Sequence, residues 1–170
     1  GISESIPVSV IICAKNEADN LKKFLPSIIS QDYPVFEIIL INDASRDKTL
    51  KVMESFTSTS DNIKIVNVKN IEAFWGNKKY ALTLGIKVAK YDYLLFTDAD
   101  CKPVSKHWIS EMSSHFNKSK TIVLGYSNYI KIKKSLLNKL IRFETLLTAV
   151  HYFSFANIGL PYMGVGRNLA

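Results

Sequence analysis

The chain has 170 residues, of which 47% are hydrophobic and 22% are charged, so it can bury the core of one domain and is not intrinsically disordered. It lacks a run of about 18 consecutive apolar residues, which excludes a conventional membrane-spanning helix within it. The formal net charge of +7 favours anionic partners, such as nucleotides, nucleic acid or acidic lipid, without choosing among them.

Apolar runs rich in β-branched residues alternate with longer amphipathic stretches, which predicts buried strands separated by helices. The predicted elements are strands at 8–14, 36–42, 63–68, 93–97 and 121–130, with helices between them at 17–31, 45–58, 78–90 and 106–118. Pro26 is expected to kink or interrupt the first helix, because it lacks the N–H of the helical ladder. Ser45 is expected to cap the N-terminus of the second helix.

The strand–helix pattern repeats four times, which is typical of βα units with parallel strands. Because the sequence has no internal repeat, low-complexity tract or linker, residues 7–130 predict one α/β unit with a mostly parallel sheet and helices on both faces. Such sheets bind ligands outside the carboxyl ends of their strands, where the strand order reverses. The residues that follow each predicted strand are therefore the candidates for a functional site.

Polar residues follow three of the first four predicted strands. Lys15, Asn16 and Glu17 come directly after the first strand, Asp43 after the second, and the sequence TDAD ends the fourth. For any one of these turns helix capping is the better explanation, because Asn, Asp and Ser are favoured where helices begin. Parallel strands bring all three turns to one rim of the sheet, and the set as a whole favours a ligand site.

The chain lacks the glycine-rich signatures that cradle phosphates, namely GxGxxG after the first strand and GxxxxGK[ST]. A bound diphosphate would then need a divalent cation, and Mg²⁺ is typically held by one or two carboxylates plus substrate phosphates. Asp98 and Asp100 suit this role, because residues i and i+2 of an extended chain point the same way. Cys13 and Cys101 each end an apolar run and are expected to be thiols, not a disulfide or zinc ligands.

Three segments, VSVIICAKNEADNLKKFLPSIISQDYP, EIILINDASRDKT and GNKKYALTLGIKVAKYDYLLFTDADC, closely resemble the nucleotide-binding half of family 2 glycosyltransferases. The resemblance runs in order from about Pro7 to Cys101 and resumes at GVGRNLA, residues 164–170. It implies the GT-A (Rossmann-like) fold, a three-layer α/β/α sandwich with a mostly parallel central sheet. It also implies an inverting, metal-dependent transfer of a hexosyl group from a nucleotide sugar, for which a UDP-sugar is the expected donor.

Carried over position by position, the resemblance implies where the nucleotide binds. Ala14 and Lys15 would lie at the turn that contacts the nucleoside, and Glu17 would face the ribose or base. Asp43 corresponds to the second acid of the family's DD pair and would read the uracil N3–H. Asn42 stands in place of the first acid of that pair.

The resemblance also implies the cation site. Lys78 matches a basic residue that contacts the nucleotide, and an anionic ligand would explain a lysine at a helix start, where a cation is unfavourable against the helix dipole. Asp100 is expected to bind the metal, Mg²⁺ or Mn²⁺, directly. Asp98 is expected to bind the ribose or the metal.

In this family the glycine-and-asparagine segment lies beside the acceptor. The matching acceptor-side residues are Gly164, Gly166, Arg167 and Asn168. The family's general base comes from an acidic motif further downstream, and the sequence given stops at Ala170, so no catalytic base is assigned. Residues 1–170 are therefore expected to bind the nucleotide without transferring sugar, and Glu111 and Glu144 are expected to be surface carboxylates.

The segment 131–170 differs from the core 7–130, with which it is expected to form one domain fragment. Between Ile130 and Phe143 it has five basic residues and no acid, and its leucines follow a helical stripe. Such a basic amphipathic helix either packs on the sheet or lies on an anionic membrane. The fragment itself is expected to be soluble, whereas the longer protein is expected at the cytoplasmic face of a membrane. Many relatives have flanking transmembrane helices and glycosylate lipid or polymer acceptors. The acceptor is therefore expected to be an unidentified lipid, polysaccharide or other molecule, and a lipid-linked acceptor is considered.

Three other classes of protein fit the sequence less well. A nucleotidyltransferase, or a non-catalytic nucleotide-binding module of similar fold, is the main alternative, but the former needs a glycine-rich basic loop where AKNEADN stands. A phospho-acceptor signalling domain needs an acidic pair after the first strand and an aspartate after the third, which ends in NVKN. Nucleic acid is not expected as a partner, because the basic residues cluster at 131–142 and do not interleave with aromatic residues.

Overall fold

The computed structural model describes residues 5–69, 77–103, 105–114, 122–124, 130–133 and 163–165. The strands are β1 (Val8–Ala14), β2 (Phe36–Asp43), β3 (Ile63–Val68), β4 (Tyr93–Asp98), β5 (Cys101–Pro103), β6 (Ile122–Leu124), β7 (Ile130–Lys133) and β8 (Met163–Val165). The helices are α1 (Ala18–Ile29), α2 (Thr49–Thr57), α3 (Asn77–Val88) and α4 (Trp108–Ser113). The first four predicted strands and the three helices between them are confirmed, with ends that differ by a few residues.

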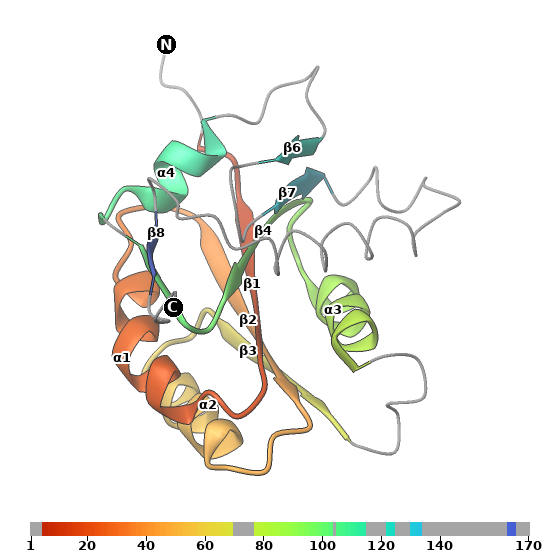
Figure 1. Ribbon diagram of the computed structural model, residues 1–170. Coiled ribbons are helices and arrows are strands. Elements are labelled where there is room, and N and C mark those ends of the chain that lie inside the picture. The colour runs from red at the N-terminus through yellow and green to blue at the C-terminus, as the bar shows by residue number, and fades with distance from the viewer. Residues whose placement is uncertain are drawn as a thin grey trace.

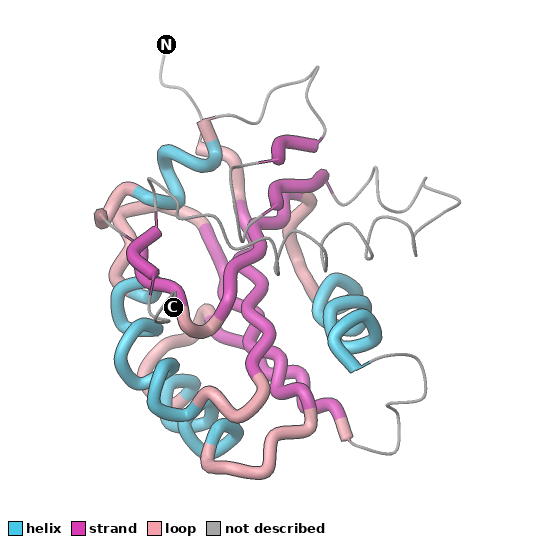
Figure 2. The backbone as a smooth tube through the Cα atoms, viewed as in Figure 1, coloured by secondary structure: helices cyan, strands magenta, loops and turns pink. Residues whose placement is uncertain are grey.

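A six-stranded sheet in the order β3-β2-β1-β4-β7-β6 forms the middle layer. β1 pairs in parallel with β2 and β4, β2 pairs in parallel with β3, and β7 is antiparallel to both of its neighbours. Figures 1 and 2 show α1 and α2 on one side of this sheet and α3 on the other. The expected three-layer α/β/α sandwich with a mostly parallel sheet is confirmed, and its strand order reverses between β1 and β4.

Each face of the sheet has its own buried apolar cluster. Val10 and Ile12 of β1 belong to the cluster with α1 and α2, whereas Ile11 belongs to the cluster with α3. In β2, Leu40 faces α1 and α2, and Ile41 faces α3. Successive side chains of a strand point to opposite faces of the sheet, so this alternation also shows to which face each residue at the end of a strand points.

Helix α3 approaches the sheet closely at Gly85. A Cβ atom at this position would lie 2.3 Å from Cδ1 of Ile41, which is itself fully buried. A glycine in the middle of a helix costs about 1 kcal/mol relative to alanine, so its presence here is explained by packing and not by helix propensity. The close contact fixes α3, whose N-terminal end lies at the carboxyl edge of the sheet (Figure 1).

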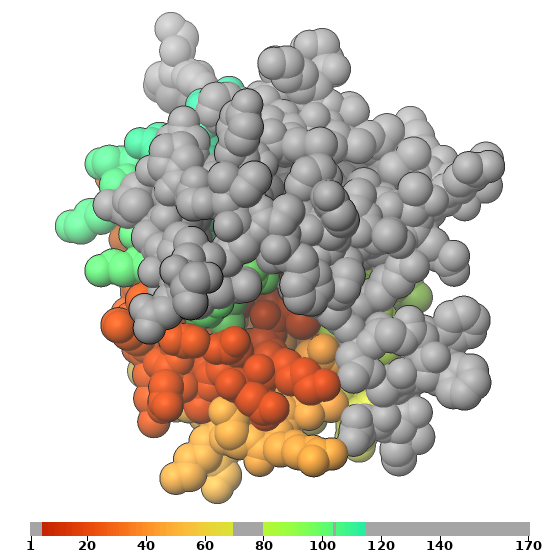
Figure 3. Space-filling model, viewed as in Figure 1, coloured from red at the N-terminus to blue at the C-terminus, as the bar shows by residue number. Residues whose placement is uncertain are grey.

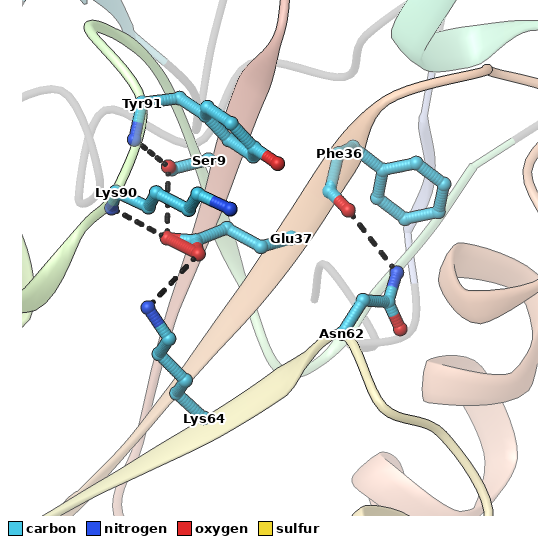
Figure 4. Close-up of polar contacts among 7 residues, drawn as sticks. All are labelled: Ser9, Phe36, Glu37, Asn62, Lys64, Lys90 and Tyr91. Atoms are coloured by element: carbon cyan, nitrogen blue, oxygen red, sulfur yellow. Dashed lines mark hydrogen bonds and ion pairs between the residues drawn. The ribbon is translucent and has the colours of Figure 1, made fainter.

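A buried carboxylate ties three strands and a loop together at the opposite, amino edge (Figure 4). Glu37 Oε1 accepts hydrogen bonds from the hydroxyl of Ser9 at 3.1 Å and from the backbone N–H of Lys90 at 2.7 Å. Its other oxygen pairs with the Nζ of Lys64 at 3.3 Å. The N–H of Tyr91 donates to Ser9 Oγ at 3.2 Å, so this buried pair anchors the connection from α3 to β4.

Several local predictions are wrong. Ser45 does not cap α2, which begins at Thr49 after the N-cap residue Lys48. Pro26 does not interrupt α1, which continues to Ile29, because proline costs the helix one N–H bond and tertiary packing of the apolar face compensates. A kink at Pro26, the other expected outcome, stays a prediction. The single strand predicted at 121–130 is two antiparallel strands, β6 and β7, so the chain reverses between them.

The C-terminal segment departs from its prediction where it is described. Lys131 and Lys133, assigned to a basic helix, belong to strand β7, which pairs with β4. The rest of that predicted helix lies outside the described residues, as does Glu144. Strands β5 and β8, which pair with each other as a second sheet, were not predicted. Among the helices that the structure describes, none is both long enough and apolar enough to cross a membrane.

Candidate functional site

The candidate site begins where the order of the strands reverses. At this point Cys13 of β1 is the register partner of Asp98, the last residue of β4. On its other side Cys13 pairs with Ile41 of β2, and Asp43 lies two residues further along β2. By the alternation of side chains, Cys13, Asp98 and Asp43 share the face of the sheet that α3 covers.

Asp98 also belongs to a cluster of groups that could hold a metal ion. The carboxylate oxygens of Asp98 and Asp100 and the sulfur of Cys101 all lie within 4.8 Å of one another. The Cys101 thiol donates a hydrogen bond of 3.5 Å to Asp100 Oδ1, and the Asp100 residue is only 8% exposed. Carboxylate oxygens suit a hard cation such as Mg²⁺ or Mn²⁺, whereas a thiol does not, so the two aspartates fit the metal implied by the sequence.

The reason given above for the pairing of these two aspartates is wrong. Ala99 and Asp100 form a turn after β4, not a continued extended strand, so the alternation of an i, i+2 pair does not apply. The turn brings the two carboxylates together all the same. A turn also lets Asp100 be buried while Asp98 stays at the half-buried edge of the sheet.

Asn42 and Asp43 point to opposite faces of the sheet and have different roles. Asn42 donates its amide to Asn67 Oδ1 at 2.8 Å and accepts the N–H of Ser45 at 3.3 Å. It therefore links β2, β3 and the turn that follows β2. An asparagine suits this position because it both donates and accepts, and a carboxylate could not donate to Asn67.

The turns after β1 and β2 are hydrogen-bonded to each other. Asn16 donates its backbone N–H to Ser45 Oγ at 2.9 Å, and its side-chain oxygen accepts the N–H of Arg46 at 2.8 Å. Asn16 and Ala44 have positive φ angles, 54° and 49°, which are disfavoured for residues other than glycine. Asparagine tolerates this conformation best, and here its side-chain hydrogen bond stabilises it.

Helix α1 is capped by residues of the turn after β2. Its N-cap residue Glu17 makes no side-chain cap, but the N–H of Glu17 donates to Thr49 Oγ1 at 2.9 Å and that of Ala18 to Asp47 Oδ2 at 3.3 Å. Asp47 Oδ1 also accepts the N–H of Thr49 at 2.9 Å, at the start of α2. Burial alone would raise the pKa of the Asp47 carboxyl, but these hydrogen bonds outweigh it and hold the pKa below its ordinary value of 3.8.

The residues predicted to contact the nucleoside lie at the edge of the sheet where the turns after β1 and β2 are hydrogen-bonded to each other. Ala14 is buried, so only its backbone can contact a ligand, whereas the side chain of Lys15 is exposed. The carboxylate of Glu17 accepts a hydrogen bond of 2.6 Å from the amide of Asn20 within its own helix. Lys78 lies in the first turn of α3, the helix on the face that Asp43 and Asp98 share. Figure 3 shows the β1–α1 and β2–α2 segments side by side on the lower part of the molecule.

The second sheet brings Gly164, predicted to lie on the acceptor side, next to the acidic cluster. Gly164 of β8 pairs with Lys102 of β5, and Val165 pairs with Cys101, which directly follows Asp100. Gly166, Arg167 and Asn168 lie outside the described residues. Glu111 is exposed on α4, as expected of a surface carboxylate.

Sequence reasoning missed the position of Cys13 and the hydrogen bonds that join the two turns. Cys13 is half-buried between the two aspartate-bearing strands, and neither it nor Cys101 forms a disulfide, which confirms the thiol prediction. The alternation along VSVIICA could have placed Cys13 on the face of Ile11. Asn16 contacts Arg46 and Asp47 contacts Ala18, each about 30 positions away in the sequence. A local sequence pattern cannot predict such contacts.

These features define an α/β protein of the GT-A type, with an acidic cluster at the point where the strand order reverses. Residues 9–163 match the family model described as "Glycosyl transferase family 2", and the chain belongs to this family. The family and fold predictions are thus confirmed. They weigh against the nucleotidyltransferase alternative, and the chain is assigned to the glycosyltransferase class.

Two curated relatives of the chain are also named as glycosyltransferases. The chain is 34% identical over 104 residues to the glycosyltransferase AglE of Haloferax volcanii, a match that covers 60% of this chain and 33% of AglE. It is 32% identical over 142 residues to the probable glycosyltransferase YdaM of Bacillus subtilis, covering 82% of this chain and 34% of YdaM. The chain therefore spans about a third of the length of these curated relatives.

A solved structure supports the fold. The mannosyltransferase PcManGT from Pyrobaculum calidifontis, in complex with GDP-Man and Mn²⁺, superposes with a TM-score of 0.70 at 20% identity. That match covers 82% of this chain and 48% of PcManGT. TarS 1-349 of S. aureus in complex with UDP-GlcNAc superposes with a TM-score of 0.61 at 18% identity, covering 79% of this chain and 47% of that one.

Proposed function

We propose that the chain is the donor-binding part of an inverting, metal-dependent glycosyltransferase that uses a UDP-sugar. The observation that carries this proposal is the acidic cluster of Asp98 and Asp100, set where β1 and β4 meet and the strand order reverses. In open α/β sheets this is the place where ligands bind. Asp43, on the same face at the end of β2, gives the site a second group that can accept a hydrogen bond.

In this proposal Asp100 holds a divalent cation, Mg²⁺ or Mn²⁺, and Asp98 binds either the cation or the ribose. The mutual proximity of their carboxylates supports the assignment, as does the Mn²⁺ in the complex of PcManGT. When bound, the cation would act as a Lewis acid that stabilises charge on the departing diphosphate. The two aspartates would hold the cation from the half-buried and buried positions that they occupy at the end of β4.

Asp43 would accept the N3–H of uracil, and the backbone of Ala14 would contact the nucleoside beside Lys15. Glu17 would face the ribose or base, because its carboxylate can accept further hydrogen bonds beside the one from Asn20. Lys78, in the first turn of α3, would contact the nucleotide phosphates together with the positive end of that helix. The UDP-GlcNAc complex of TarS is consistent with a uridine nucleotide.

The acceptor would lie on the side of β5 and β8. The pairing of Lys102 with Gly164 supports this part of the proposal, because it brings Gly164 near Asp100. Gly166, Arg167 and Asn168, which follow Gly164 in the sequence, are proposed to belong to the same acceptor side. The acceptor is proposed to be lipid-linked, as in the relative from Escherichia coli named for a diphosphoundecaprenol acceptor. The longer protein would then act at the cytoplasmic face of a membrane.

These assignments give different roles to two segments of the chain. Residues 7–130 would form the nucleotide-binding core, and residues 131–170 would belong to the acceptor side. In this proposal Asp43, Asp98 and Asp100 bind the metal or the nucleotide, and none of them acts as the general base. Transfer of the sugar would therefore need a general base from another part of the protein. Residues 1–170 are thus proposed to bind the donor without completing transfer, and any turnover by them would contradict this part of the proposal.

The experiment that tests the proposal is a calorimetric titration of UDP with and without Mn²⁺. UDP should bind more tightly with Mn²⁺, and Asp100→Ala should remove that gain. Asp92→Ala is the matched control, because Asp92 is exposed and precedes β4 at the amino edge of the sheet. Equal UDP affinity with and without Mn²⁺, or equal behaviour of Asp100→Ala and Asp92→Ala, would contradict the proposal.

A further inference from the structure

The side chain of Gln31, which follows the C-cap residue of α1, joins two distant parts of the fold. Its amide nitrogen donates to the carbonyl of Ser105 at 2.8 Å and to that of Ser27 at 3.1 Å. Its amide oxygen accepts the backbone N–H of Ile109 at 3.0 Å. Gln31 is only 7% exposed, so it is a buried amide whose donor and acceptor groups are both engaged.

The same amide serves the ends of two helices. Ser27 has one of the last four carbonyls of α1, which lack a partner within an α-helix. Ile109 has one of the first N–H groups of α4, whose N-cap residue makes no side-chain cap. The backbone N–H of Asp32 adds a hydrogen bond of 2.8 Å to the carbonyl of Lys106. The end of α1 is thus fixed against the start of α4, chiefly by Gln31.

The segment that Gln31 holds begins at the acidic cluster. After Asp98 the chain turns, forms β5 against α1 and runs back towards α4 (Figure 1). Cys101, the first residue of β5, has its sulfur within 4.8 Å of carboxylate oxygens of Asp98 and Asp100. Ser105 comes two positions after the last residue of β5. The hydrogen bond from Gln31 to Ser105 therefore anchors the far end of a short segment whose near end bears Asp100.

Apolar packing also holds this segment on α1, but it is less specific about position. Cys101 and Trp108 belong to the buried cluster that contains Leu25 and Ile28 of α1. Such contacts are non-directional, whereas a buried amide that loses its partners costs about 1–3 kcal/mol. The hydrogen bonds of Gln31 therefore select one placement of the segment along α1.

We infer that Gln31 is a positioning residue for the cation site: by holding Ser105 it fixes β5, and with β5 the turn that bears Asp100. The inference rests on the proposed binding of a divalent cation by Asp98 and Asp100. Gln31 acts through β5 and not through contact with the cation or the nucleotide. Carboxylates that are already held in place bind a cation more tightly, because less ordering is needed on binding. Loss of the amide should therefore weaken the contribution of the metal and leave metal-free binding of UDP unchanged.

The test replaces the amide by an apolar side chain of the same length, in Gln31→Met. Calorimetric titration of UDP in Mn²⁺ and in EDTA gives the gain in affinity that the cation supplies. This gain should fall about fivefold in Gln31→Met, while the affinity in EDTA stays that of the wild type. The matched control is Asn62→Leu, which removes a half-buried amide that donates to the carbonyl of Phe36 at 3.2 Å, between β2 and β3. Asn62→Leu should lose stability but keep the full Mn²⁺ gain.

A second measurement examines β5 without any ligand. Hydrogen exchange of the ¹⁵N-labelled chain should be several-fold faster at the amides of Cys101 and Lys102 in Gln31→Met, relative to the amide of Leu40 in β2. A role in overall stability alone would speed the exchange of Leu40 at least as much. Gln31→Glu keeps an acceptor for the N–H of Ile109 but cannot donate, so it provides the same comparisons if Gln31→Met does not fold.

The outcomes separate this inference from the proposed function. A smaller Mn²⁺ gain with faster exchange in β5, in the Gln31 variant and not in Asn62→Leu, supports the positioning role. A full Mn²⁺ gain in Gln31→Met, an equal reduction in Asn62→Leu, or exchange at Cys101 no faster than at Leu40 would overturn the inference and leave the donor site intact. An absence of any Mn²⁺ gain in the wild type would contradict the proposed cation site itself, and the inference falls with it.

Discussion

Cys13 of β1 and Asp98 of β4 are register partners at the point where the strand order reverses. The thiol is half-buried, and its neighbours on the same face are the two strand ends that bear Asp98 and Asp43. A ligand held between those carboxylates would lie over the thiol. The sulfur of Cys13 can therefore report on occupation of the site.

We predict that UDP and Mn²⁺ together slow the alkylation of Cys13 by a small maleimide several-fold, because the bound nucleotide covers the thiol. The rate is measured by mass spectrometry of the Cys13 peptide. The unmodified Cys13 peptide is read in the same sample as the reference. An alkylation rate of Cys13 that is equal with and without UDP and Mn²⁺ would place the ligand elsewhere.

The left-handed backbone of Asn16 leads to a second prediction. Asn16→Gly keeps the conformation but loses the hydrogen bond to the Arg46 N–H, and should cost about 1 kcal/mol of unfolding free energy. Asn16→Ala loses the hydrogen bond and also strains the backbone, which adds about 1–2 kcal/mol. Urea denaturation measures both variants. If alanine is no more destabilising than glycine, the positive φ does not matter in solution.

A third prediction concerns Asp47 and pH. Because hydrogen bonds hold its folded-state pKa below 3.8, folding favours the ionised carboxylate. The resulting stabilisation is complete above the ordinary pKa and is lost as the pH falls through the folded-state pKa. The unfolding free energy of the wild type should thus fall more steeply below about pH 4 than that of Asp47→Asn.

Denaturation curves at a series of pH values test this difference in slope. Asp61→Asn removes the same charge from an exposed turn and should keep the wild-type slope. A profile of Asp47→Asn that runs parallel to the wild type would show that the hydrogen bonds of Asp47 do not couple folding to its ionisation.

A fourth prediction separates stability from binding. Glu37 is buried at the amino edge, where it accepts hydrogen bonds from Ser9 and Lys90. Glu37→Leu leaves both donors without this acceptor and should cost about 3 kcal/mol of unfolding free energy. UDP affinity of the folded variant should remain that of the wild type, because the change lies at the opposite end of the strands. A parallel loss of UDP affinity would contradict this separation.

The sequence predicts the core of the fold because its signals are local. The apolar runs that contain Val10, Ile39 and Leu95 have the length and β-branched composition of buried strands, and all three are buried in β1, β2 and β4. The acidic strand ends are equally visible, since Asp43 and Asp98 directly follow the predicted strands 36–42 and 93–97.

Features that depend on contacts between distant segments could not be predicted in the same way. The division of 121–130 into two strands depends on the pairing of β7 with β4. The capping of α1 depends on Asp47 of the turn after β2 and on Thr49 at the start of α2. The turn at Asp100 differs from the predicted extended chain, because the alternation of a strand does not continue beyond the end of β4.

The most direct test of the central claim is to locate Mn²⁺ by nuclear magnetic resonance on the ¹⁵N-labelled chain with UDP bound. Mn²⁺ broadens the amide signals that are closest to it. Ser9 and Cys13 are four residues apart on β1, about 13 Å along the strand, so the two edges of the sheet can be distinguished. The account predicts that the signals of Cys13 and Asp98 disappear first, while those of Glu37 and Lys90 persist. Broadening that begins at Glu37 and Lys90, or that is uniform over the chain, would contradict a cation site at Asp98 and Asp100.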